Sequence, residues 1–442
     1  MKVKVRIVAV LCCLLIIFSL VGCHLFNGGR YNFEALGSPN DVEALNYNEI
    51  IDEDFTAFKD KLEQFSALFA SSAYGKESGG NVAISPVSVY MALAMTIECA
   101  GGETRQEILN GLGMTYEEVK GYTSMLYRQL NIENKRQNKK IGELSLSNTI
   151  WIDDELSYKE GTINNLANDY LCYSNSVDFN GDKDGANKAI RGFIKDKTNK
   201  LIDKDFDLSE ETICAIVNTL YLKDVWNDVG KDLEYANGKY KFKNSNGKES
   251  DVSLLQSYYT IANVMEGEKY RTCYAVTESG YRIKFILPKD GYAVSEVFNS
   301  ETILEVNAIT DYKGYDEVNN VQYNTRVLFP AFKAGYDNDV KEVLKQYFNV
   351  NRMFDRDRAE FSNLVDDQKM SAWVEAVRHV TSLTVDKKGI EGAAVTVVQL
   401  PGATAPRPMT KVYQDFIIDK AFGFIVTDRY NTTIFSGVIN NV

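Results

Sequence analysis

Histidine is nearly absent from this chain: of its 442 residues, only His24 and His379 are histidines. Histidine is the commonest general acid or base in enzymes, so this scarcity removes most routes to acid–base catalysis. The sequence also lacks a G-x-S-x-G nucleophile elbow, an H-E-x-x-H zinc motif and a P-loop. A serine hydrolase that uses His379 as its base stays open as an alternative, but the pattern predicts a protein that is not an enzyme.

Closely spaced cysteines are absent as well. Three of the seven cysteines, Cys12, Cys13 and Cys23, lie in or beside an N-terminal apolar run, and the other four are far apart, with no C-x-x-C pair and no neighbouring histidine. This excludes the common zinc and dithiol motifs. We therefore expect no metal and no cofactor, and we expect small buried side chains at the remaining four cysteines. These are Cys99, Cys172, Cys214 and Cys273.

Positive charge is in deficit, because 49 lysines and arginines stand against 61 aspartates and glutamates, a formal net charge of -12. Nucleic-acid binding needs a basic surface, so nucleic acid is excluded as the main partner. One short basic cluster is present at Lys135, Arg136, Lys139 and Lys140. Because it is short and rich in asparagine, we interpret it as a solvated turn.

No long Gly-, Ser- or Pro-rich stretch interrupts the chain after Phe55, so residues 55–442 are expected to form one domain. Helical periodicity dominates its first part and strand patterns dominate after about residue 202, which predicts an α+β fold and not a doubly wound sheet. Gly111 and Gly113 are expected to end the third helix. The expected helices cover 55–69, 87–97, 104–109, 117–130, 187–202 and 339–348, and the expected strands cover 148–152, 214–222, 240–242, 282–287, 374–385 and the segment from 416 onward.

The N-terminus has the pattern of an export signal, in which basic residues precede an apolar run over 7–21 that is too short for an ordinary spanning helix. The run ends in Leu-Val-Gly-Cys, which resembles the bacterial lipobox. Residues 1–22 are therefore expected to be a lipoprotein signal peptide, and Cys23 is expected to carry the lipid that holds the exported protein on a bacterial membrane or cell surface. Residues 23–54 are expected to be a flexible tether. A plain cleaved signal or an uncleaved anchor stays open.

Proline is scarce, yet three of the seven prolines, Pro401, Pro406 and Pro408, lie within eight residues. The segment just before them, 388–398, is rich in residues that favour strands. Proline removes the backbone donor that a ladder needs, so the second half must lie outside any sheet. We expect an exposed loop whose first half, with small residues over 392–394, is able to enter between two strands.

Five segments resemble the serpin family in the family's own order, over roughly residues 55–442, and five ordered matches make coincidence improbable. The resemblance implies a single serpin-like α+β domain with three β-sheets, eight or nine helices and an exposed reactive-centre loop over about 387–415. The matching segments are Asn-Val-Ala-Ile-Ser-Pro-Val-Ser at 81–88, Asn-Thr-Leu-Tyr-Leu-Lys at 218–223 with Trp226, Phe-Pro-Ala-Phe-Lys at 329–333, His379 to Gly389 with the alanine-rich run after it, and Lys-Ala-Phe-Gly-Phe at 420–424 with 435–440.

The resemblance also implies roles for residues of the central sheet. The shutter, where the sheet opens, is expected to contain Ser85, Ser88, Asn218 and His379, with the histidine hydrogen-bonded to Asn218. Each of these polar groups would cost ~1 to 3 kcal/mol if buried alone, so they are expected to satisfy one another. The expected hinge comprises Gly389, Ile390, Glu391, Gly392, Ala393 and Ala394, and the expected breach comprises Lys223 and Trp226.

By resemblance, the chain is expected to inhibit serine proteases as a suicide substrate, through loop cleavage, acyl-enzyme trapping and insertion of the cut loop into the central sheet. The family's spacing from Gly389 places the attacked bond between Ala403 and Thr404, whose small side chains suit an elastase-like protease. Arg407 and Met409 are competing positions. We expect a monomer whose partners are this protease and the membrane.

The hinge departs from the family pattern, most importantly at Ile390. The bulk of a β-branched side chain that enters the sheet first opposes fast insertion, and slow insertion makes a substrate instead of an inhibitor. Burial of this apolar side chain favours insertion, and no charged residue or proline interrupts 392–400, so inhibition stays the expectation. A non-inhibitory serpin that serves as a surface binding module is therefore the alternative. Sulfated polysaccharide, which some serpins bind on a helix near the basic cluster, also stays open as a ligand.

Overall fold

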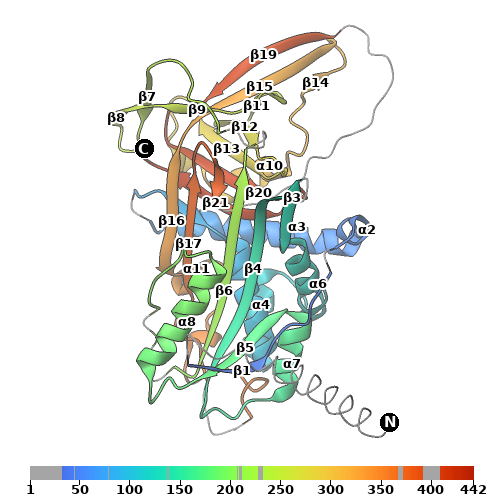
Figure 1. The fold of residues 1–442 in the computed structure, drawn as a ribbon, viewed down its shortest axis with the longest axis vertical. Coiled ribbons are helices and arrows are strands. Elements are labelled where there is room, and N and C mark those ends of the chain that lie inside the picture. The colour runs from blue at the N-terminus through green and yellow to red at the C-terminus, as the bar shows by residue number, and fades with distance from the viewer. Residues whose placement is uncertain are drawn as a thin grey trace, which may run out of the picture.

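A central β-sheet runs along the body, and helices cover both of its faces (Figure 1). Strand β4 (Lys139–Asp153) shows why, because its side chains alternate between the two faces. Ile150 packs into the main core with helix α4 (Pro86–Cys99), whereas Trp151 packs into a second core with helix α8 (Lys183–Lys197). The computed structural model describes residues 32–442 except 44, 78, 137–138, 207, 209–211, 227–231, 367–371 and 392–408.

The described residues contain ten α-helices, of which α2 and α9 are single turns of four residues, so eight are longer. Helix α3 begins after Asp52, whose side chain accepts a hydrogen bond from the Phe55 N–H at 3.0 Å. Helix α4 is buried on nearly every side, as its lack of a polar face predicts. The helices other than α4 and α8 are α2 (Tyr47–Ile50), α3 (Glu53–Tyr74), α5 (Gly102–Leu112), α6 (Tyr116–Gln129), α7 (Glu160–Asp169), α9 (Val294–Val297), α10 (Ser300–Ala308) and α11 (Lys341–Phe348).

The central sheet has the strand order β1-β5-β4-β6-β18-β17-β16, with β3 paired to β4. Sheet B has the order β2-β21-β20-β13-β12-β11 and is joined to the central sheet through the pair Gly335 and Val82. The strands of these two sheets, other than β4, are β1 (Glu34–Gly37), β2 (Val82–Ile84), β3 (Ile132–Arg136), β5 (Cys172–Val177), β6 (Cys214–Val225), β11 (Met265–Glu266), β12 (Tyr270–Val276), β13 (Arg282–Pro288), β16 (Phe332–Asp339), β17 (Arg378–Val385), β18 (Gly389–Glu391), β20 (Phe422–Thr427) and β21 (Thr433–Ile439).

Sheet C lies at the upper end of the molecule in Figure 1. Its central strand β15 pairs with β19 along one edge and with β9, β10 and β14 along the other. These three sheets are the number expected, and a separate hairpin is formed by β7 and β8. The bounds are β7 (Tyr240–Lys243), β8 (Glu249–Val252), β9 (Leu254–Gln256), β10 (Thr260–Ile261), β14 (Tyr315–Asp316), β15 (Val321–Pro330) and β19 (Thr410–Ile417).

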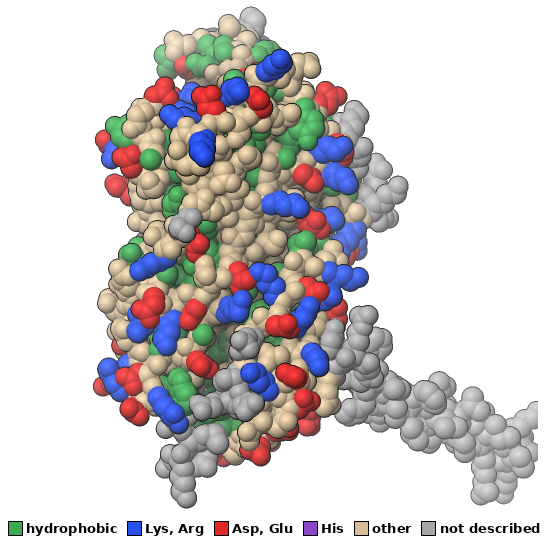
Figure 2. Space-filling view, turned by 90° about the vertical axis from the view of Figure 1, so that its left-hand side faces the viewer, with side chains coloured by type: hydrophobic (Ala, Val, Ile, Leu, Met, Phe, Trp, Pro, Cys, Tyr) green, Lys and Arg blue, Asp and Glu red, His purple; other side chains and the backbone are tan. Residues whose placement is uncertain are grey.

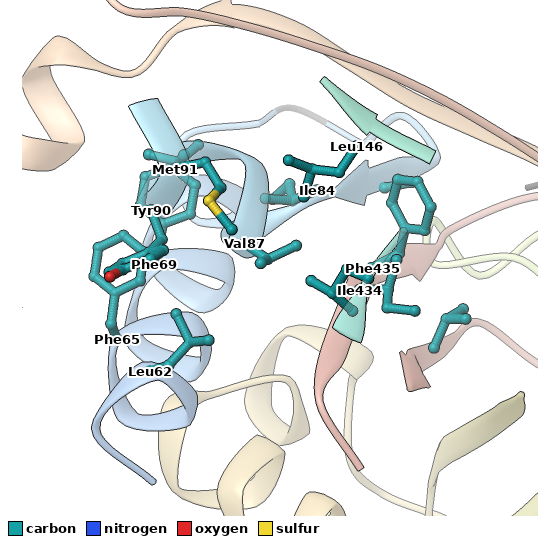
Figure 3. Close-up of a cluster of buried hydrophobic side chains, with 14 of the residues drawn as sticks. Leu62, Phe65, Phe69, Ile84, Val87, Tyr90, Met91, Leu146, Ile434 and Phe435 are labelled. Carbon is teal, nitrogen blue, oxygen red and sulfur yellow. The ribbon is translucent and has the colours of Figure 1, made fainter. Parts of the chain in front are cut away.

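The main core lies between helices α3 and α4 and the sheets (Figure 3). Phe65 and Phe69 on α3 recur at helical spacing and stack at 5.6 Å between ring centroids. Ile84 and Val87 are buried on either side of Ser85. The apolar packing of these two neighbours fixes the place at which Ser85 meets the central sheet.

The tether expected over residues 23–54 is wrong for its described part. Strand β1 pairs antiparallel with β5, and Phe33 packs edge-on against Trp151 with ring centroids 5.2 Å apart. Helix α2 follows with a capping box between Asn46 and Glu49. The domain therefore begins before Phe55, because the N-terminal segment adds an edge strand to the central sheet.

Several element boundaries also differ from the sequence expectations. Gly111 lies inside α5, and Gly113 ends that helix in the left-handed conformation with φ 66°. The strand expected over 374–385 begins only at Arg378. The residues before it bond elsewhere, because the Val374 N–H donates to the Met353 carbonyl. No helix was expected from the sequence at the positions of α7, α9 and α10.

Charged side chains of both signs are mixed over the visible surface (Figure 2). The basic cluster lies in the β3–β4 hairpin, where Lys135 pairs with Glu133 and Lys140 pairs with Glu133 and Glu143. These exposed ion pairs agree with a solvated turn.

Cys99, Cys172 and Cys273 are buried and Cys214 is half-buried, and all four are free thiols. Burial was thus predicted correctly for three of them. Among the described residues, no helix combines the length and the apolar character that crossing a membrane requires.

Candidate functional site

The central sheet has a gap between β6 and β17 that is filled only at its upper end among the described residues. There β18 pairs with both neighbours: Ile390 lies opposite Asp224 of β6 and opposite Val385 of β17. Below this point, within the described part of the chain, β6 and β17 form no ladder with each other. An extended segment that continues from β18 has an open path between two strands.

A cavity of about 480 Å³ lies along the lower part of this gap. Its walls are the facing parts of β6 and β17, with α4 contributing apolar side chains such as Leu93. A much smaller void of about 10 Å³ lies beside Ser85 and Leu220, between the cavity and β18. The unfilled space therefore runs along the gap between β6 and β17, below β18.

The four expected shutter residues come together at this gap, but not in the predicted pairing. The Ser85 N–H donates to His379 Nε2 at 3.1 Å, and Ser88 Oγ donates to Asn218 Oδ1. Asn218 Nδ2 donates to Asn148 Oδ1 at 2.8 Å. The expected hydrogen bond between His379 and Asn218 is wrong: each side chain is already satisfied by a residue at the start of α4 or a neighbouring strand.

His379 is a buried acceptor and not a general base. It is 4% exposed, and burial lowers its pKa to about 3, so the imidazole is neutral at physiological pH. Aromatic side chains flank it, with the Phe69 ring 6.3 Å and the Tyr336 ring 5.8 Å from the imidazole centroid. Ser85 meets this imidazole through its backbone N–H, and Ser85 Oγ has no hydrogen-bond partner among the described residues. The two therefore do not form a nucleophile–base pair.

The described part of the hinge is already seated in the sheet. Only glycine fits at position 389, because a Cβ there would lie 1.8 Å from the Asp224 carbonyl oxygen. Ile390 is 1% exposed, and the Glu391 carboxylate accepts from Tyr221 OH at 3.2 Å and from Lys223 Nζ at 3.3 Å. The other hinge residues, Gly392, Ala393 and Ala394, lie outside the described residues, as do Ala403, Thr404 and Cys23.

Of the expected breach residues, Lys223 contacts the hinge and Trp226 contacts the turn just before it. Trp226 is 1% exposed and its Nε1 donates to the Asp386 carbonyl at 2.7 Å, in the turn between β17 and β18. The Asp386 carboxylate in turn accepts from the Lys388 N–H at 2.7 Å and from the Gly389 N–H at 3.3 Å. Lys223 is half-exposed and reaches Glu391. The breach therefore fixes the turn from which the hinge starts.

Sequence reasoning missed Asp224, which lies beside the hinge. Its carboxyl is buried and accepts from Ser279 N–H at 3.2 Å and from Ser279 Oγ at 3.1 Å, and burial raises its pKa to about 7. The available signal was an acidic residue inside a strand-like run between Leu222 and Trp226. This carboxyl ties the upper end of β6 to the loop after β12, next to the point where Ile390 pairs.

The central sheet thus combines a seated strand end, β18, with a gap below it between β6 and β17. The family model described as Serpin (serine protease inhibitor) matches residues 60–442 of this chain. The chain belongs to the serpin family. Serpins are protease inhibitors and not enzymes, and their partners are serine proteases.

Individual relatives are distant but cover most of the chain. Alpha-1-antiproteinase S of Cavia porcellus is 24% identical over 397 residues, covering 84% of this chain and 88% of the relative. A serine protease inhibitor of Cyanea capillata is 26% identical over 392 residues, covering 86% and 97%. Among solved structures, the thermophilic serpin tengpin in its native state has a TM-score of 0.71 at 21% identity, covering 92% of this chain and 100% of tengpin. Its latent state has a TM-score of 0.67, covering 90% and 100%.

Proposed function

We propose that this chain inhibits serine proteases as a suicide substrate, by loop cleavage, acyl-enzyme trapping and insertion of the cut loop between β6 and β17. The observation that carries this proposal is β18, which already occupies the top of the gap. Insertion then needs only to continue from residue 392 downward. The family supplies the coarser statement of protease inhibition.

Burial of Ile390 supports inhibition over the alternative of a binding module. A slow, non-inhibitory loop would result if this β-branched side chain still had to enter the sheet first. It is 1% exposed and already lies between two strands in the uncleaved chain, which supports an unhindered start to insertion. Ile390 therefore no longer favours a non-inhibitory binding module over an inhibitor.

The gap also has favourable interactions to offer an entering strand. Ser85 Oγ and Thr219 Oγ1, which line the small void and the large cavity, are buried hydroxyls without a hydrogen-bond partner among the described residues. An unsatisfied buried hydroxyl costs ~1 to 3 kcal/mol. A strand that enters adds ladder hydrogen bonds and fills the cavity with side chains such as Thr396 and Val398, so insertion is downhill.

In the proposed reaction, the protease serine attacks the carbonyl carbon of Ala403. The bond to Thr404 breaks, its nitrogen leaves as a free amine, and Ala403 stays on the protease as an ester. Insertion of the loop then drags the protease to the far end of the sheet before water hydrolyses the ester. The distorted protease cannot complete the second step.

Incubation with pancreatic elastase followed by denaturing electrophoresis tests this proposal. A band at the summed mass of inhibitor and protease that survives boiling in detergent is the expected result, because the ester is covalent. Cleaved chain and free active protease, with no such band for elastase-, trypsin- or chymotrypsin-like enzymes, would show that the chain is a substrate.

We also propose an exported, membrane-anchored monomer of bacterial lipoprotein type, on the basis of Leu-Val-Gly-Cys at 20–23. Several acyl chains at ~0.8 kcal/mol per buried CH₂ hold such a protein on a membrane. Cys23→Ser should leave the precursor unprocessed or release it from the membrane fraction. An unchanged mass and distribution would contradict the anchor.

A further inference from the structure

Large apolar side chains on the surface are concentrated at one end of this molecule. Eight of the fourteen that are exposed in the described residues lie on sheet C or the segments beside it, although this sheet is a small part of the chain. Figure 2 shows hydrophobic and charged side chains side by side at this upper end. The eight are Tyr235, Tyr258, Tyr259, Ile261, Tyr315, Val318, Tyr413 and Ile417.

Strand register places several of them on one face. Along β19, alternate residues are exposed, and Tyr413 is 60% exposed. Asn324 of β15 lies between Tyr413 on one side and Ile261 on the other. Tyr315 pairs with Gln322, which lies two residues before Asn324 and therefore on the same face of β15. We call Tyr259, Ile261, Tyr315, Arg326 and Tyr413 the tyrosine face.

The side chain of Arg326 is held in place within this face by hydrogen bonds. Its guanidinium donates to both carboxylate oxygens of Asp415, at 2.9 and 2.8 Å, and to Gln256 Oε1 at 2.9 Å. The same guanidinium lies 5.1 Å from the centroid of the Tyr259 ring, and Tyr259 meets Tyr413 edge-on at 5.2 Å. These contacts hold the two rings in place before any partner binds. Rigid tyrosines around an arginine are typical of the residues that dominate binding energy at protein interfaces.

We infer that the tyrosine face is a docking surface for the target protease, in addition to the reactive loop. This inference rests on the proposed function and names a second contact of the same partner. The reason for this occupant is continuity: the segment that contains Ala403 and Thr404 leads through Met409 directly into β19, on which Tyr413 is the third residue after Thr410. Tyr413 follows Ala403 by only ten positions in the sequence, so a protease bound to that segment is within reach of the face.

The chemistry of the face fits a protease surface better than a strongly charged ligand. Arg326 is neutralised by Asp415, so this guanidinium adds no net charge to the aromatic and apolar side chains of the face. Docking there adds binding energy before cleavage but takes no part in sheet opening. Loss of the face should therefore slow the encounter without changing how the loop partitions between trapping and hydrolysis.

The double variant Tyr259→Ser with Tyr413→Ser tests the inference, and Tyr292→Ser with Tyr347→Ser is the matched control. The control tyrosines are also exposed but lie outside sheet C. The protease is the member of an elastase-, trypsin- and chymotrypsin-like panel that cleaves the 392–408 segment of the full chain fastest. We expect the second-order rate constant to fall roughly tenfold for the double variant, with an unchanged stoichiometry of inhibition and an unchanged control. Tyr413→Ser alone serves if the double variant does not fold.

A rate constant equal to that of the unchanged chain, or an equal fall in the control, overturns the inference. The two proposals fail separately. If the chain is cleaved but never trapped, the suicide mechanism is wrong, yet kcat/KM for loop cleavage still reports docking and still decides the role of the tyrosine face.

Discussion

Trp226 Nε1 donates a 2.7 Å hydrogen bond to the carbonyl oxygen of Asp386, and this bond joins the end of β6 to the turn between β17 and β18. Below this point, in the described part of the chain, β6 and β17 are no longer joined, so the bond lies at the upper end of the gap between them. It also positions the turn from which Gly389 enters the sheet. The end of β6 and the turn that leads into the hinge are thus held together through one indole.

Trp226→Phe should lower the free energy of unfolding by ~1 to 3 kcal/mol beyond the cost of the smaller ring, because the Asp386 carbonyl loses its donor. Trp151→Phe is the matched control, since Trp151 is equally buried and its Nε1 has no hydrogen-bond partner among the described residues. Urea midpoints of the two variants give the comparison. Equal losses would mean that the bond contributes nothing.

Gly389→Ala should expel the hinge from the sheet, because the new Cβ would lie 1.8 Å from the Asp224 carbonyl oxygen. Insertion would then have to start with the hinge outside the central sheet. The stoichiometry of inhibition should therefore rise severalfold in a titration of active protease. Gly121→Ala in α6 is the control, because its Cβ meets open space. If Gly389→Ala inhibits as efficiently as the unchanged chain, the seated hinge is not what speeds insertion.

His379 should make the native fold sensitive to acid. Burial lowers its pKa from 6.5 to about 3, so between these values the unfolded chain binds a proton that the folded chain does not. The stability that the buried, neutral imidazole contributes to the fold is therefore fully present above pH 6.5 and is lost as the pH falls toward 3. His379→Gln, which keeps an acceptor for the Ser85 N–H, should lose less stability between pH 7.5 and 5 in urea unfolding. Parallel curves for both proteins would contradict this assignment.

The local parts of this site could be predicted from the sequence, and the pairings could not. Helix α3 follows from its apolar spacing, and the shutter residues were identified by motif. The partner of His379 depends on where β2 and α4 meet β17, a relationship between segments about 290 residues apart that no periodicity encodes. The pairing of β1 with β5 and the seat of Ile390 between two strands are likewise matters of register, which short patterns leave open.

Cleavage of the loop should raise the melting temperature by tens of degrees. The cut segment gains ladder bonds on both sides between β6 and β17, and its side chains fill the cavity of about 480 Å³. Calorimetry of the chain before and after limited proteolysis measures the change, with proteolysis confirmed at a single site. A melting point that stays the same after clean cleavage would show that the gap does not accept the loop.

The position of the attacked bond is constrained by the length of strand that can insert. Each inserted residue advances ~3.3 Å, and insertion continues from Glu391 at the top of the gap. Cleavage after Ala403 gives the family's length, whereas cleavage after Met409 would add ~20 Å of slack and leave the protease undistorted. Ala403→Arg should therefore shift inhibition from elastase-like to trypsin-like proteases, because the residue before the cut fills the specificity pocket. Met409→Ala is the control and should change little. Mass spectrometry of the released C-terminal peptide identifies the bond: a peptide that begins at Thr404 is expected, and one that begins at Thr410 would overturn the assignment.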